Sequence, residues 1–147
     1  MATQLELALF AKEFIKVKNL PEAERWELER DKEVPLGLFV TLHPLSRPEE
    51  RYRARIRWND YFSAFSLKFI NLETGSVIDP TAWPQCFGFR PASFDACLPW
   101  TAEGQALHPE WLASGNQSFP AIEVPMQYAL LRVQLSLDST YQGRGRA

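Results

Sequence analysis

Two cysteines and two histidines are the side chains of this sequence best suited to nucleophilic and acid–base chemistry. Cys97 lies in the short apolar segment 94–100, and Cys86 lies in the aromatic segment 83–87. A cysteine thiolate is a strong nucleophile, but a cysteine among aromatic side chains is often only a small buried apolar residue. From these surroundings, Cys97 fits either description, whereas Cys86 fits a packed thiol.

The spacing of these residues argues against metal and redox chemistry. No Cys-x-x-Cys pair and no His-x-x-x-His pair occurs, so Cys86, Cys97, His43 and His108 predict neither a zinc site nor a redox dithiol. We expect no metal and no cofactor. An unrelated redox or cysteine hydrolase domain has little beyond the two thiols to support it, because spacing identifies no acidic or amide partner for His108.

A row of arginines is the other chemical feature of the sequence. Arg51, Arg53, Arg55 and Arg57 alternate with apolar residues, as on the polar face of a half-buried strand. Such a face is usually solvated, although it could also meet an acidic partner or phosphates. The net charge is only -2, which provides no global basic field. We therefore expect no nucleic-acid partner and no membrane partner.

Two amphipathic helices are predicted to flank these residues. Thr3 and Glu6 form a capping box, and apolar residues then recur at helical spacing as far as Ile15. The second helix is predicted over 122–137, with Pro125 in its first turn. Their apolar faces must pack on other elements, so both helices are expected to cover a core.

Strands and a long irregular segment are predicted between the helices. Alternation and turn signals predict strands over 26–30, 36–42, 51–58 and 65–69. No crossover helix is available between them, so an antiparallel meander is expected. Proline and glycine then punctuate residues 71–119 without periodicity, and we expect the functional site there, because long ordered loops are often functional.

Length and composition predict one domain spanning residues 1–147, with a flexible tail over 143–147, and the predicted helices and antiparallel strands make its class α+β. The chain is 46% hydrophobic and 23% charged, which is typical of a globular protein with a real core. No apolar run of about 18 residues occurs, and residues 1–10 lack the pattern of a secretory signal. We expect a cytoplasmic protein whose cysteines are free thiols.

The order of helix, four-strand meander, long loop with a Cys97-Leu98-Pro99 step, Trp100 and closing helix resembles the ubiquitin-conjugating enzymes. It is most similar to the divergent bacterial members encoded beside ubiquitin-like proteins. Those relatives share a segment like 96–101, a glycine such as Gly104 and a His-Pro-Glu-Trp stretch like 108–111.

The resemblance implies a UBC-like fold and a thioester-forming enzyme. Cys97 would accept the C-terminal carbonyl of a ubiquitin-like protein from an activating enzyme and transfer it to a lysine amine of a target protein. His108 is then the first residue expected to assist, by lowering the pKa of the thiol, deprotonating the amine or donating to the oxyanion. It could equally be a surface or cap histidine. The resemblance to the bacterial members also implies a role in antiphage defence.

One departure from the family pattern leaves an alternative function open. Eukaryotic members carry a His-Pro-Asn motif before the cysteine, and its Asn stabilises the oxyanion, but residues 87–92 of this chain contain no Asn. Arg90, His108 or a backbone N–H could replace it. Alternatively, the chain is a non-catalytic adaptor that binds a ubiquitin-like protein or an activating enzyme.

Overall fold

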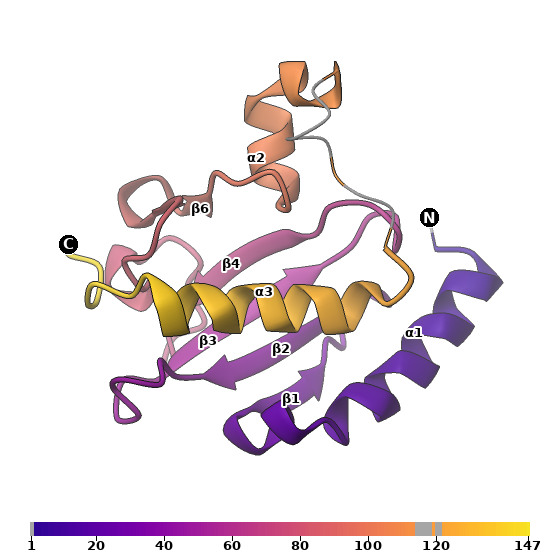
Figure 1. The fold of residues 1–147 in the computed structure, drawn as a ribbon, viewed down its shortest axis with the longest axis horizontal. Helices are drawn as coiled ribbons and strands as arrows, with labels where there is room; N and C mark the ends of the chain where they lie inside the picture. The colour runs from indigo at the N-terminus through magenta and orange to yellow at the C-terminus, as the bar shows by residue number, and fades with distance from the viewer. Residues whose placement is uncertain (1, 114–118, 120–121) are drawn as a thin grey trace.

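A four-stranded antiparallel sheet and two long helices form the body of this α+β structure (Figure 1). The computed structural model describes residues 2–113, 119 and 122–147. The predicted N-terminal helix, antiparallel meander and C-terminal helix are confirmed. The described helices and strands, with 3₁₀ helices labelled η, are α1 (Gln4–Lys18), η1 (Pro21–Arg25), β1 (Glu27–Arg30), β2 (Gly37–Leu42), β3 (Tyr52–Arg57), β4 (Ser66–Ile70), η2 (Pro80–Ala82), β5 (Phe89–Arg90), η3 (Pro91–Ser93), β6 (Asp95–Ala96), α2 (Ala102–Leu107), η4 (Pro109–Ala113) and α3 (Pro125–Ser139).

Helix α1 begins at the predicted capping box. The Thr3 hydroxyl accepts a hydrogen bond from the Glu6 amide at 3.1 Å, and the Glu6 carboxylate accepts one from the Thr3 amide at 2.9 Å. The second oxygen of Glu6 accepts a hydrogen bond from the Tyr61 amide at 2.8 Å. The bond from Tyr61 is the main reason that the pKa of Glu6 lies below its ordinary value. The cap therefore also fixes the turn between β3 and β4.

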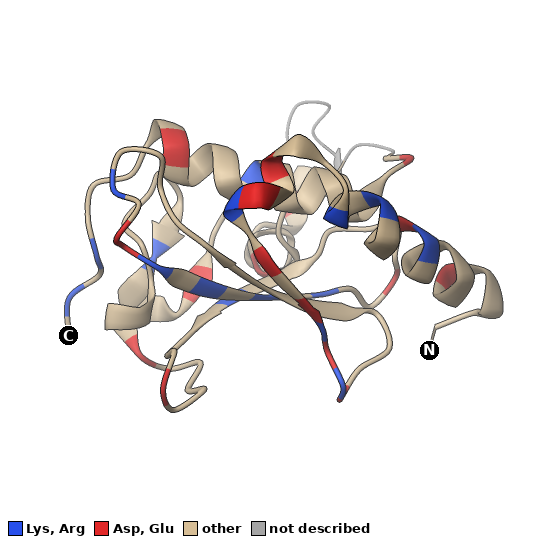
Figure 2. Ribbon diagram, turned by 90° about the horizontal axis from the view of Figure 1, so that it is seen from below, with Lys and Arg blue, Asp and Glu red and all other residues tan. Residues whose placement is uncertain are grey.

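Strand β3 has one buried face and one polar face, as its alternation predicts. Tyr52, Ala54 and Ile56 are almost completely buried. The arginines between them lie on the opposite face, where Figure 2 shows basic and acidic residues on neighbouring strands. Ion pairs neutralise three of the four arginines: Arg51 with Glu27, Arg53 with Glu29, and Arg57 with Asp31. This pairing favours the interpretation of the row as an ordinary solvated face.

Helix α3 lies across the buried face of the sheet, and α1 lies beside it (Figure 1). Glu13 of α1 is 8% exposed and joins the two helices. Its carboxylate accepts a hydrogen bond from the Gln127 amide at 2.9 Å, in the first turn of α3, where Val124 supplies no side-chain cap. It also accepts a hydrogen bond from the Tyr61 hydroxyl. Burial and this bond raise the pKa of Tyr61.

The end of the chain is bound to the body of the structure. The Gly145 amide donates to the Trp83 carbonyl at 2.7 Å, and the Gly143 carbonyl accepts from the Gln85 amide at 2.8 Å. Between them, the Arg144 guanidinium lies 4.2 Å from the centroid of the Tyr52 ring. These contacts tie residues 143–145, a segment without sequence periodicity, to distant residues. The flexibility of the tail over 143–147 stays a prediction.

The segment predicted to be irregular contains short elements, of which α2 is the most regular. Helix α2 is six residues long and includes Gly104, so it has no apolar periodicity by which it could be predicted. Its one sequence signal is Thr101, whose side chain caps it by accepting a hydrogen bond from the Gly104 amide. Among the described residues, no helix is both long and apolar enough to cross a membrane.

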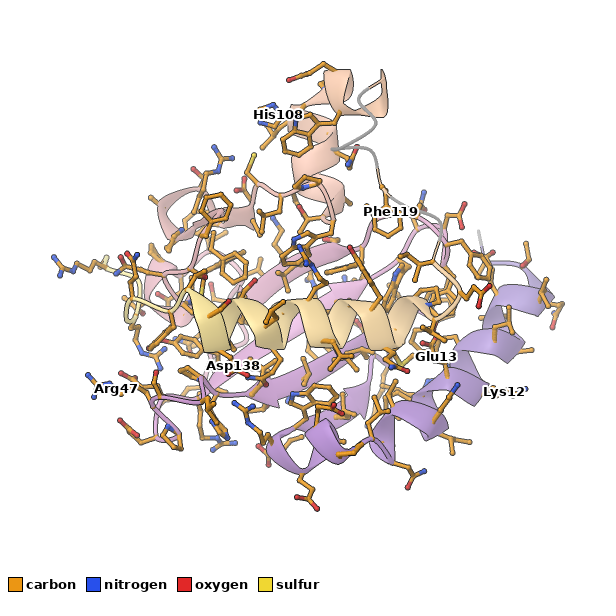
Figure 3. The ribbon with its side chains drawn as sticks, viewed as in Figure 1. Lys12, Glu13, Arg47, His108, Phe119 and Asp138 are labelled. Carbon is orange, nitrogen blue, oxygen red and sulfur yellow. The ribbon has the colours of Figure 1, made fainter. Side chains whose placement is uncertain are left out.

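We predict that Glu13→Ala lowers the free energy of unfolding by about 2–3 kcal/mol, because it leaves the Gln127 amide and the Tyr61 hydroxyl without their acceptor. Lys12→Ala on the same helix is the control, since Lys12 is exposed (Figure 3), and it should change stability by less than about 0.5 kcal/mol. Urea unfolding followed by tryptophan fluorescence measures both. Equal stabilities would contradict the role of Glu13 as a cap for α3.

Candidate functional site

Cys97 follows the β5–β6 hairpin directly. Phe89 pairs with Ala96 and Arg90 pairs with Asp95, and the Cys97 amide then donates to the Gly88 carbonyl at 2.8 Å. This bond extends the two-residue ladder by one step. The thiol of Cys97 is free and partly exposed. The backbone of the candidate nucleophile is therefore fixed, while its side chain is accessible.

Leu98, the next residue, is confined between two glycines. Gly88 has a φ of +80°, and a Cβ there would lie 2.4 Å from the Leu98 side chain. A Cβ on Gly104 would lie 2.1 Å from the Leu98 carbonyl oxygen. Both distances are far below van der Waals contact, so a side chain at either position requires Leu98 to move. The two glycines thus set the position of the segment that carries Cys97.

Thr101 and Gln105 tie the same segment to the start of α2. The Thr101 hydroxyl donates to the Ala96 carbonyl oxygen and accepts from the Gly104 amide at 3.0 Å. The Gln105 amide group donates to the Pro99 carbonyl oxygen at 2.6 Å. Hydrogen bonds to α2 and its cap therefore hold the loop from Ala96 to Thr101 both before and after Cys97.

Trp100 anchors the cysteine loop in the core. It is 4% exposed, and its ring lies 5.6 Å from Phe65 and 6.4 Å from Phe89, measured between ring centroids. The Arg132 guanidinium of α3 lies 5.4 Å from the centroid of the same ring. The Ala102 amide donates to the Phe65 carbonyl at 2.7 Å. The loop is therefore joined to the sheet near β4 and to α3.

Arg90 and Asp95 form a bidentate ion pair beside Cys97. Arg90 Nε lies 2.8 Å from Asp95 Oδ1, and Arg90 Nη2 lies 2.7 Å from Asp95 Oδ2. These bonds are the main cause of the raised pKa of Arg90. Phe94, in the turn between the two strands, has a φ of +58°, and its carbonyl accepts a hydrogen bond from Lys68 Nζ at 2.8 Å. The hairpin is thus held at its end as well as at its base.

His108 lies at the outer end of α2, in the part of the molecule that projects from the body (Figure 3). Its Nδ1 is 3.0 Å from Glu110 Oε1, and its ring stacks on Trp111 with centroids 4.2 Å apart. The bond to His108 holds the pKa of Glu110 below its ordinary value. Glu110 is the acidic partner that spacing did not identify. Within the described residues, no hydrogen bond or ring contact joins His108 to Cys97.

The second cysteine is a packed thiol, as predicted. Cys86 is 7% exposed, and burial raises the pKa of its thiol to about 12. At neutral pH it is therefore almost entirely protonated. Across residues 2–113, 119 and 122–147, no group of three or more His, Cys, Asp or Glu side chains is placed to hold a metal ion.

Comparison of the chain with protein-family models, with curated proteins and with solved structures gave no match. The function is therefore inferred from the site itself. A partly exposed thiol on a fixed loop can meet a large electrophile without rearrangement of the backbone. The neighbouring Arg90, with Asp95 beside it, provides a cation for an anionic species at this surface.

We predict that Gly104→Ala lowers the free energy of unfolding by more than about 2 kcal/mol, because the new methyl group meets the Leu98 backbone. Helix propensity alone would predict that alanine raises the free energy of unfolding by about 1 kcal/mol, so the sign of the measured change distinguishes the two effects. Gly75→Ala is the control: it meets no atom within 4 Å, and its φ of +74° should cost only about 1 kcal/mol. A Gly104→Ala variant as stable as the parent chain would contradict the confinement of Leu98.

Proposed function

We propose that this chain is a ubiquitin-conjugating-type transferase of UBC-like fold, in which Cys97 carries a ubiquitin-like modifier as a thioester. An activating enzyme supplies the modifier, and a lysine amine of a target protein receives it. The observation that supports this most is the presentation of Cys97, whose thiol is partly exposed while Leu98 is immobilised beside it. We also propose a cytoplasmic location and a role in bacterial antiphage defence, as the family resemblance implies.

The transfer consists of two acyl exchanges at one sulfur. The Cys97 thiol first loses its proton to solvent, and the thiolate attacks the activated C-terminal carbonyl of the modifier. A carbon–sulfur bond forms, and the tetrahedral oxyanion collapses with departure of the activating enzyme's leaving group. The lysine amine then attacks the thioester carbonyl and loses a proton, and Cys97 leaves as a thiolate. The product is an amide, and the thiol is regenerated.

His108 serves this reaction as a base at the edge of the site. In the tautomer that carries its proton on Nδ1, His108 donates to Glu110, and Nε2 is the ring nitrogen left to accept a proton. Its side chain is 38% exposed, so it is accessible to an incoming amine. Because it makes no bond to Cys97, this role belongs to the second exchange, in which the proton to be removed is on the lysine.

A non-catalytic adaptor of the same fold is the second candidate. It is favoured by the absence, among described residues, of any side chain hydrogen-bonded to the Cys97 thiol. Such an adaptor would bind a ubiquitin-like protein or an activating enzyme without covalent chemistry.

We predict that incubation with the genomically neighbouring activating enzyme and ubiquitin-like protein, plus ATP, yields a reductant-sensitive adduct on non-reducing gels. Cys97→Ala should abolish the adduct, because the acyl acceptor is lost. Cys97→Ser should give either a reductant-resistant oxyester or no adduct. Cys86→Ala is the matched control, and it should keep the adduct, because the Cys86 thiol is buried.

A thioester that persists on Cys97→Ala would contradict the assignment of the nucleophile. The absence of an adduct, when the activating enzyme itself is shown to be charged, would favour the adaptor instead.

A further inference from the structure

Arg90 and Cys97 lie on the same face of the β5–β6 hairpin. Residues that oppose each other across a ladder share a face, and successive residues along a strand alternate. Arg90 opposes Asp95, and the bond from the Cys97 amide to the Gly88 carbonyl places these two residues opposite each other in the next step. The other face carries Phe89 and Ala96, which are 7% and 0% exposed and belong to the core.

Arg90 and Cys97 are diagonal neighbours on this face, because Arg90 opposes Asp95 and Cys97 lies two residues beyond Asp95. Gly88, the residue opposite Cys97, has no side chain of its own. Diagonal neighbours on a ladder are within reach of a long side chain, so the Arg90 guanidinium can approach the sulfur. Consistent with this proximity, a charge on Cys97 contributes to the raised pKa of Arg90.

Asp95 orients Arg90 without occupying all of its donors. The ion pair uses Nε and Nη2, and Nη1 donates to no described residue. The Arg90 side chain is 45% exposed, whereas that of Asp95 is 12% exposed. A guanidinium held in this way is a fixed cation with a free donor at the protein surface.

We propose that Arg90, positioned by Asp95, stabilises the anionic form of the Cys97 sulfur and, during acyl transfer, the oxyanion that forms next to it. The thiolate part of this inference stands for any reaction of Cys97. The oxyanion part rests on the proposed transferase function, in which Arg90 supplies the donor that the residues 87–92 otherwise lack.

Other charged groups around the cysteine loop are engaged elsewhere. Lys68 donates to the Phe94 carbonyl and lies 3.7 Å from Glu103, and His108 is bonded to Glu110. These groups are unchanged when Arg90 is replaced, so their contribution cancels in a comparison of variants.

The test is the pH dependence of Cys97 alkylation by iodoacetamide, measured in a Cys86→Ala background. Arg90→Gln should shift the alkylation profile to higher pH and lower the rate at pH 7 about threefold to tenfold, because the thiolate loses a nearby cation. Arg90→Met, which keeps the length of the side chain without its charge, should show the same loss. Arg47→Gln is the control: it removes the same charge in the β2–β3 turn, where Arg47 is exposed and pairs with Glu49 (Figure 3).

A profile for Arg90→Gln that matches Arg47→Gln would overturn the proposal, and if Arg90→Gln does not fold, the same comparison is made with Arg90→Met. Alkylation requires no partner protein, so a shift in this profile supports the role of Arg90 in thiolate stabilisation even if no modifier adduct forms. An adduct that forms normally in Arg90→Gln would overturn the oxyanion part while leaving the transferase function standing.

Discussion

Leu98 is confined between Gly88 and Gly104, and the position of Cys97 depends on that confinement. One glycine belongs to the start of the β5–β6 hairpin and the other to α2, so the contact joins the two elements that flank the cysteine. Protein interiors resist even small added volumes, and here the obstacle to a side chain at Gly104 is backbone. The close contacts around Leu98 hold the segment from Ala96 to Thr101 in place, and Cys97 within it is partly exposed.

The core of the structure holds the cysteine loop in this arrangement. Trp100 anchors the loop against Phe65, and the joined helices α1 and α3 cover the face of the sheet that carries the core. Glu13 caps α3 from α1, so the support of the site is continuous from one end of the chain to the other. The groups that could take part in chemistry lie at the surface of this packed structure: Cys97, Arg90 and His108. In the proposed transfer, the Cys97 thiol would meet two large partners in turn, and a loop held in place by the core suits that task.

Local sequence patterns were sufficient to predict the helices and strands, whereas the geometry of the candidate site depends on contacts between residues far apart in the sequence. The capping box of Thr3 and the alternation of β3 express local energetics, so the sequence was sufficient to predict them. Helix α2 and the bound tail depend on contacts with Leu98 and Trp83, which no periodicity encodes. The acidic partner of His108 is two residues away, but a pairing of exposed side chains is not determined by spacing. The Cys-Leu-Pro-Trp setting makes Cys97 the candidate nucleophile, and that role stays a prediction. The pairing of Arg90 with Asp95 is seen only in the register of the hairpin.

The central claim is that this chain presents one reactive thiol, at Cys97, and buries the other. Its most direct test is alkylation of the native protein near pH 8, followed by peptide mass spectrometry over time. We predict rapid and complete labelling of Cys97 and negligible labelling of Cys86, whose thiol has a pKa raised to about 12 by burial. Labelling of Cys86 at a rate equal to that of Cys97, or protection of Cys97 until the protein is unfolded, would contradict the account.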